Sequence, residues 1–232
     1  MAPPDAAVYP AATGPAKNIV DKHSEPADLV LYSGWFCPYV EVNPYHKPES
    51  LLKLNPRGLV PTLQYQNKPL FESNVVLEFL EDAYPSHKPS LRPSDPYERA
   101  RARIWTDYVT TRIIPGYHRF LQFQPGRSDK TIEDVRQEFL NHLKEWTNEM
   151  DPAGPFFLGK EPSLIDFVMG PWALRLWVFD QFKGGLGIPE TGASNDDKTW
   201  IRWRKWYDAI SAHPSLKNTM SDGEHYIPLY KR

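Results

Sequence analysis

A proline-rich stretch divides the chain into two parts that have different hydrophobic patterns. Residues 85–96 contain four prolines in a polar setting: Pro85, Pro89, Pro93 and Pro96. Because proline lacks an amide hydrogen and fixes φ, this composition is typical of a linker between domains. The chain is therefore expected to form two domains rather than one.

Before this linker, short apolar runs predict strands, and the sequence then predicts one helix that Ser73 caps and Tyr84-Pro85 ends. The predicted strands cover residues 28–33, 40–42, 60–65 and 69–71. After the linker, apolar residues recur at helical spacing from Tyr97 onward, which predicts four to six helices. One of these helices begins at Ser163, where Asp166 can reach back to the amide of the cap residue, so this pair is interpreted as a folding device.

The pattern as a whole predicts two domains of different class. We expect an α/β domain at 27–88 and an all-helical domain at 96–232. Residues 1–26 are rich in alanine and proline, and prolines such as Pro15 are expected to block helix and strand alike. We therefore predict a disordered tail at 1–26.

Composition and charge exclude several classes of protein. Hydrophobic residues make up 41% of the chain, which argues against disorder, and a net charge of −2 without a basic stripe argues against nucleic acid as a partner. No apolar run reaches the ~20 residues that span a bilayer, and no signal peptide is recognisable. The single cysteine, Cys37, excludes an internal disulfide and indicates a reducing compartment, so a cytoplasmic location is expected. The seven histidines lack the spacing of metal ligands, so no metal site is predicted.

Several short motifs occur in an order that resembles the glutathione transferase superfamily, most closely the omega class and its fungal relatives. The motifs are Trp35-Phe36-Cys37-Pro38-Tyr39, Gly58-Leu59-Val60-Pro61, Glu72-Ser73 and Ser163-Leu164-Ile165-Asp166. The resemblance extends from Leu29 to Tyr230. It implies a thioredoxin-like domain that binds glutathione as co-substrate, followed by a helical domain that supplies the pocket for the second substrate.

The resemblance assigns four residues of the first domain to glutathione. Glu72 would face the ammonium of the γ-glutamyl group and Ser73 its carboxylate, although Ser73 as a simple helix cap is the alternative. Val60 would offer backbone hydrogen bonds to the cysteinyl moiety, next to a Val60-Pro61 bond that is cis in this family. Lys47 would meet the glycyl carboxylate, with a solvated surface lysine as the alternative.

Cys37 is the catalytic residue that the resemblance implies. The family uses a cysteine at this place to form a mixed disulfide with glutathione, in thiol transfer or reduction. A helix that begins at Pro38 would lower the pKa of this thiol through its amides and its dipole. A buried free cysteine that acts as a small hydrophobic residue is the alternative.

The sequence departs from the thioredoxin-like pattern directly after this cysteine. In that fold the first strand leads through a helix to a parallel second strand, which takes about a dozen residues or more. Here only six positions separate Cys37 from Asn43, where the segment resembling the loop after the second strand begins. The first helix is therefore expected to be missing between Val40 and Glu41, either in a genuine variant or through a faulty gene sequence.

The second-substrate pocket is assigned to three residues by the same resemblance. Trp172 and Arg175, on the helix that Ser163 opens, and Tyr230 match positions that line the omega pocket. Core packing is the alternative for Trp172.

These observations predict a homodimeric, glutathione-dependent transferase of omega type that acts on a small electrophilic or oxidised substrate. A tailoring role in fungal secondary metabolism is compatible with the resemblance. Because the first helix is missing, the alternative is a non-catalytic interaction module or an inactive truncated isoform.

Overall fold

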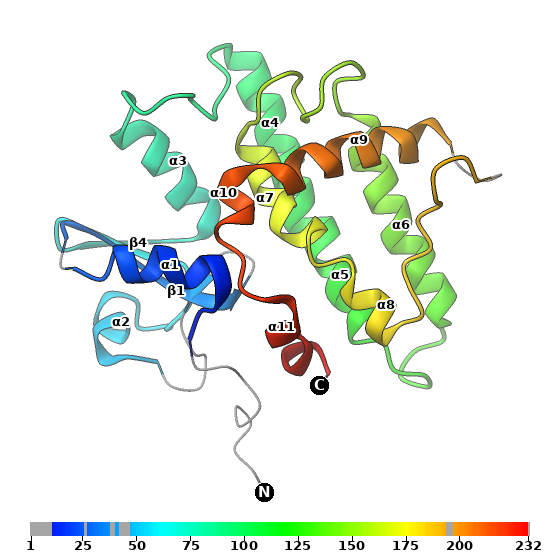
Figure 1. Cartoon of the computed structure of the whole chain (residues 1–232), viewed down its shortest axis with the longest axis horizontal. Coiled ribbons are helices and arrows are strands. Elements are labelled where there is room, and N and C mark those ends of the chain that lie inside the picture. The colour runs from blue at the N-terminus through cyan, green and yellow to red at the C-terminus, as the bar shows by residue number, and fades with distance from the viewer. Residues whose placement is uncertain (1–10, 26, 38–39, 42–46, 194–196, 232) are drawn as a thin grey trace, which may run out of the picture. The chain divides into compact units, whose positions relative to one another are not determined.

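The computed structural model describes residues 11–25, 27–37, 40–41, 47–193 and 197–231, with backbone alone at 34–37 and 40–41 (Figure 1). Contacts between residues divide the chain into two units. Residues 1–88 and 214–232 form the first unit, and residues 89–213 form the second. The boundary at 88 and 89 lies inside the predicted linker, but the last residues of the chain belong with the first unit instead of the helical domain.

A four-stranded sheet forms the centre of the first unit. Its strands are β1 (Leu29–Cys37), β2 (Val40–Glu41), β3 (Thr62–Tyr65) and β4 (Lys68–Phe71). They lie in the order β2-β1-β3-β4, and every neighbouring pair is antiparallel. All four predicted strands are therefore present, and β1 continues four residues beyond its predicted end at Ser33.

The direction of β2 follows from the short connection before it. Cys37 pairs with Val40, so only two residues separate the strands. A connection of two residues joins antiparallel strands, whereas parallel strands need a crossover of about a dozen residues or more. The first helix of a thioredoxin-like domain is thus missing, as predicted, and the second strand runs opposite to the parallel direction of that fold.

Within the described residues of the first unit, five helices accompany the sheet. They are α1 (Gly14–Lys22), α2 (Glu49–Leu54), α3 (Ser73–Ala83), α10 (Pro214–Lys217) and α11 (Gly223–Tyr230). The prediction of a disordered tail at 1–26 is wrong for the residues of α1. Pro15 lies in the first turn of this helix, where an amide hydrogen has no partner within the helix, so proline favours the helix there instead of blocking it.

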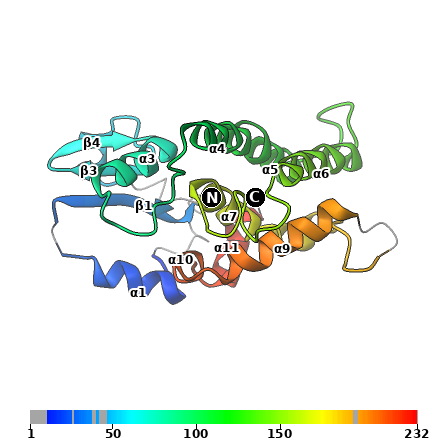
Figure 2. The ribbon, with the colours of Figure 1, turned by 90° about the horizontal axis from the view of Figure 1, so that it is seen from above.

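One face of the sheet is covered by α3 over β3 and β4 but is open over β1. Tyr65 of β3 packs edge-to-face on Phe79 of α3, with ring centroids 5.1 Å apart, and Figure 2 shows α3 next to β3 and β4. Leu63 and Leu31 are paired in the register and therefore point to this same face. Leu63 is 2% exposed, whereas Leu31 is 51% exposed. The missing helix, which covers one face of a thioredoxin-like sheet, explains this difference.

The second unit is helical, as predicted. It contains α4 (Pro96–Tyr108), the π-helical turn η1 (Val109–Ile113), α5 (Ile114–Leu121), α6 (Ile132–Asn148), α7 (Leu164–Ala173), α8 (Val178–Phe182) and α9 (Lys198–Ala212). Its core includes fully buried aromatic residues from several helices, among them Tyr117, Phe139, Trp146 and Trp206. None of the described helices is both long and apolar enough to cross a membrane.

Asp166 joins three segments of the second unit. Its Oδ2 accepts hydrogen bonds from the amide and the hydroxyl of Ser163, both at 2.8 Å, which confirms the predicted reach back to the cap residue. Its Oδ1 accepts from the amide of Phe157 and from the indole Nε1 of Trp206, also at 2.8 Å. Burial raises the pKa of Asp166, and these bonds act in the opposite direction. With four donors around a buried carboxylate, the pair serves the fold.

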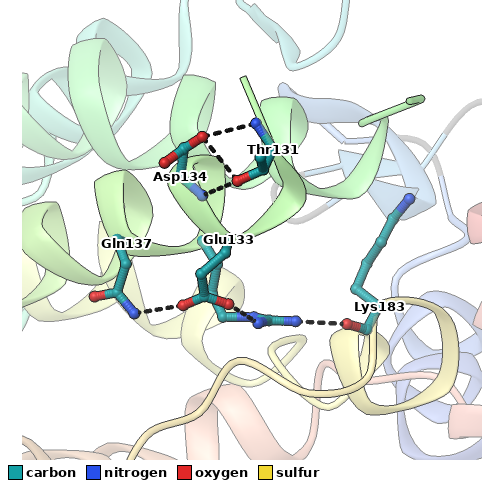
Figure 3. Close-up of polar contacts among 6 residues, drawn as sticks. Thr131, Glu133, Asp134, Gln137 and Lys183 are labelled. Atoms are coloured by element: carbon teal, nitrogen blue, oxygen red, sulfur yellow. Dashed lines mark hydrogen bonds and ion pairs between the residues drawn. The ribbon is translucent and has the colours of Figure 1, made fainter. Parts of the chain in front are cut away.

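The start of α6 repeats this device at the surface. Thr131 and Asp134 form a reciprocal capping box, in which the amide of Thr131 donates to Asp134 and the amide of Asp134 donates to Thr131 (Figure 3). In the same first turn Glu133 accepts a hydrogen bond from Gln137 at 2.7 Å. These bonds lower the pKa of both carboxyl groups.

We expect alanine substitutions at the paired leucines to differ strongly in their effect on stability. Leu63→Ala should lower the free energy of unfolding by about 2–4 kcal/mol, because it removes a buried side chain. Leu31→Ala should lower it by less than about 1 kcal/mol, because half of that side chain already faces solvent. Urea unfolding of the two variants measures both values. Equally large losses would mean that a further element covers Leu31.

Candidate functional site

The turn between β4 and α3 holds Glu72 and Ser73. Glu72 is the cap residue of α3, and Ser73 is its first helical residue, so the prediction that Ser73 caps the helix is wrong by one position. The backbone of Glu72 has φ 73°, a conformation that a residue with a Cβ atom adopts at a cost. The side chain of Glu72 makes no cap hydrogen bond. The first-turn amides of α3 therefore receive no hydrogen bond from this side chain. Amides at a helix N-terminus without a side-chain cap can bind an anionic group.

A loop between α2 and β3, at residues 55–61, is held by the side chain of Asn55. This residue is 1% exposed. Its Nδ2 donates to the carbonyl of Leu59 at 3.2 Å and to Oγ1 of Thr62 at 3.1 Å, and its Oδ1 accepts from the amide of Arg57 at 3.2 Å. The hydroxyl of Thr62 also donates to the carbonyl of Leu59, at 2.8 Å. One buried amide thus determines the path of the loop that carries Val60.

The Val60-Pro61 peptide bond in this loop is cis, as predicted from the resemblance. The role of Asn55 was not predicted from the sequence. The motif Asn55-Pro56-Arg57-Gly58 contains the signal of a turn, but the two bonds of the side chain to residues further along the chain have no local signature.

Lys47 approaches the same loop at Gly58. Gly58 has φ 58°, and a Cβ atom placed on it would lie 2.7 Å from Cδ and 3.1 Å from Nζ of Lys47. The backbone conformation favours a glycine here, and a Cβ atom would displace the lysine side chain from its present position. The lysine side chain therefore lies directly across the loop.

Glu72, which lies between β4 and α3, also approaches this loop. Its carboxylate lies 3.8 Å from the guanidinium of Arg57. Both side chains are exposed, so the pair adds little to stability. Three of the predicted glutathione residues thus gather around one loop: Lys47 and Glu72 contact it, and Val60 belongs to it. Ser73 follows Glu72 directly. The group offers a cation, an anion, a backbone edge and helix amides, the set of partners that a peptide with two carboxylates and an ammonium needs.

Cys37 is the last residue of β1. Cys37 therefore lies on an extended segment, whereas the resemblance places it directly before a helix. The next helix that the structure describes, α2, begins only at Glu49. The side chain of Cys37 lies outside the described atoms. On this backbone, the amides of a helix N-terminus do not explain a lowered thiol pKa.

The residues assigned to the second substrate lie in different units. Trp172 and Arg175 belong to the second unit and Tyr230, the last residue of α11, to the first. Trp172 is 5% exposed and packs edge-to-face on Tyr117, with centroids 5.2 Å apart, as the core-packing alternative expects. The Nη1 of Arg175 donates to the carbonyl of Pro171 at 2.7 Å, so part of its guanidinium is occupied by its own helix end.

A metal site would need several acidic, histidine or cysteine side chains close together. No group of three or more of these residues is found in the described part of the chain.

Comparison with known protein families places both halves of the chain. The model of the glutathione S-transferase N-terminal domain matches residues 20–83, and the model of the glutathione S-transferase C-terminal domain matches residues 129–209. The first match includes Lys47, the loop at 55–61 and Glu72.

Individual relatives cover most of the chain. Glutathione S-transferase U17 of Arabidopsis thaliana is 30% identical, over 84% of this chain and 91% of that protein. Glutathione S-transferase omega-2 of Homo sapiens is 29% identical, over 86% of this chain and 88% of that protein. Among solved structures, glutathione transferase Omega 3C from Trametes versicolor matches with a TM-score of 0.82 and 36% identity, covering 96% of this chain and 97% of that chain.

Proposed function

Because the chain belongs to the glutathione S-transferase family, we propose that it is a glutathione-dependent transferase of omega type that acts through Cys37. The thioredoxin-like first domain and the helical second domain are those of this family, which uses glutathione as co-substrate. The observation that carries the proposal is the arrangement of Lys47, Val60, Glu72 and Ser73 about the loop at residues 55–61.

In this proposal each residue of the group takes one part of glutathione. The ammonium of Lys47 holds the glycyl carboxylate, and the backbone of Val60 pairs with the cysteinyl moiety. The amides of α3 and the hydroxyl of Ser73 hold the γ-glutamyl carboxylate. Glu72 pairs with the ammonium and exchanges its exposed partner Arg57 for it. These contacts orient the sulfur of glutathione.

The chemistry proposed for Cys37 is thiol-disulfide exchange. The thiolate attacks the glutathionyl sulfur of a mixed disulfide, so that a disulfide forms between Cys37 and glutathione, and the substrate leaves as a thiolate that takes up a proton. The thiolate of a second glutathione then attacks the glutathionyl sulfur bound to Cys37. This step releases oxidised glutathione and restores the cysteine thiolate.

Trp172, Arg175 and Tyr230 are each proposed to contact the second substrate. We further propose a homodimer in the cytoplasm, since dimers are typical of the family. A small electrophilic or oxidised substrate, including one from fungal secondary metabolism, is the substrate class in this proposal.

The reversed strand β2 favours a second candidate function. Without the helix after Cys37 the thiol lacks the usual source of its activation, which supports a glutathione transferase-like interaction module without catalysis, or an inactive isoform. Such a module needs neither glutathione nor a reactive thiol, so a first measurement, of glutathione binding, separates the candidates, and a second tests the activation of the thiol.

The first measurement is calorimetric titration with glutathione. We expect the chain to bind it, and we expect Glu72→Gln to weaken binding about tenfold, because one charge-assisted hydrogen bond is lost. Asp21→Asn is the matched control, since Asp21 is also an exposed carboxylate of the first unit in an ion pair, at 2.6 Å from Lys17. A folded chain that fails to bind glutathione would favour the interaction module.

The second measurement is the pH dependence of alkylation by iodoacetamide. Because Cys37 ends a strand, we expect the rate to rise with a midpoint near the ordinary thiol pKa of about 8.5, and disulfide exchange to accelerate over the same range. A chain with a family-like helix restored after Val40 should show a lower midpoint. Fast alkylation at pH 6 that is lost in Cys37→Ala would contradict this expectation and reveal another source of activation.

A further inference from the structure

The two ends of the chain are joined within the first unit by a set of hydrogen bonds. We call this contact, between residues 12–16 and 220–226, the terminal clasp. The amide of Thr13 donates to Oγ of Ser221 at 3.2 Å, and the amide of Ala16 donates to the carbonyl of Met220, also at 3.2 Å. Thr13 and Ser221 are 208 positions apart in sequence. The clasp therefore connects the first and the last segments of the first unit.

The hydroxyl of Thr13 is the centre of this clasp. It accepts the amide of Asp222 at 3.1 Å and lies 2.7 Å from Nδ1 of His225. Thr13 is also the cap residue of α1, but its side chain makes no cap hydrogen bond there. The hydroxyl of a threonine at the cap position usually accepts a hydrogen bond from an amide in the first turn of its own helix. Here both partners of the hydroxyl lie at the beginning of α11 instead.

The chain on either side of Thr13 fits closely against the same helix start. Gly14 has φ 54°, and a Cβ atom on it would lie 2.6 Å from Oδ1 of Asp222. The flanking side chains of Ala12 and Ala16 are 6% and 5% exposed. Small residues therefore let the first segment approach the cap residue of α11, so the hydrogen bonds of Thr13 form in a packed contact.

The helix α11 depends on such anchors. It has eight residues, contains Pro228, and Tyr226 is its one buried residue. A helix of this length is marginal on its own in water. The hydroxyl of Tyr226 accepts the amide of Ser221 at 3.2 Å, so this anchor and the clasp meet at the same residue. The clasp and Tyr226 together hold the start of α11, and the helix ends at Tyr230.

We propose that Thr13 is a positioning residue for Tyr230, acting through α11. This inference rests on the proposed function, in which Tyr230 contacts the second substrate. Thr13 itself contacts neither glutathione nor the second substrate. Its hydroxyl keeps the short helix at a fixed place, and the loss of that hydroxyl leaves the glutathione residues around the loop at 55–61 unchanged.

The test compares two ligands in four forms of the full-length chain. In the proposed function, glutathione occupies only its own site, whereas the alkyl chain of S-hexylglutathione is expected to reach Tyr230 as well. Their affinities are measured by calorimetry for the unchanged chain and for Thr13→Val, Thr13→Ser and Thr219→Val. The last is the matched control, because the hydroxyl of Thr219 donates locally, to the carbonyl of Ser215 at 2.7 Å. Amide hydrogen exchange of residues 223–230 is recorded for each form.

We expect Thr13→Val to weaken S-hexylglutathione about fivefold, to leave glutathione unchanged and to accelerate exchange in α11. Thr13→Ser, which keeps the hydroxyl, and Thr219→Val should resemble the unchanged chain. Faster exchange without a change in S-hexylglutathione affinity would overturn the proposal, and so would an equal loss for both ligands. If the unchanged chain bound no glutathione at all, the proposed function would fail, and this inference with it.

Discussion

The two-residue connection between Cys37 and Val40 is the constraint on which the rest of the first unit depends. A chain that must pair again after two residues can only turn back, so β2 lies antiparallel to β1. The strand order β2-β1-β3-β4 is nevertheless complete, because β1 pairs with β3 through residues 29–32 and with β2 only from Ser33 onward. The pairing of β1 with β3 does not depend on its pairing with β2. The sheet can therefore form without the first helix.

The same constraint separates the two parts of the site. The residues proposed to bind glutathione lie around the loop at 55–61, which the buried side chain of Asn55 holds through hydrogen bonds to Leu59 and Thr62. Cys37, in contrast, ends β1 directly before the shortened connection. In the proposed function, the binding of glutathione and the activation of the thiol therefore depend on different segments of the first unit.

Local patterns predicted much of the fold, and long-range contacts account for most of what they missed. Ser163 and Asp166 form the expected pair because the motif acts within one turn. The helix α1 was missed because Pro15 disrupts a helix interior but suits a first turn, and the difference depends on where the helix starts. The return of residues 214–232 to the first unit was missed because the bonds of Thr13 to Ser221 and His225 leave no periodic signal. The resemblance to the glutathione transferases identified the residues of the candidate site from the sequence. That Glu72, and not Ser73, is the cap residue of α3 was seen only in the backbone of the structure.

Nuclear magnetic resonance tests the reversed strand most directly. Gly34 pairs with Glu41 in the antiparallel ladder, and residues seven positions apart come this close only if the chain turns back between them. A chain labelled with ¹⁵N and ¹³C should give a nuclear Overhauser effect between the backbone protons of Gly34 and Glu41. Its absence, together with consecutive amide-to-amide contacts that run on from Cys37 as in a helix, would contradict the account.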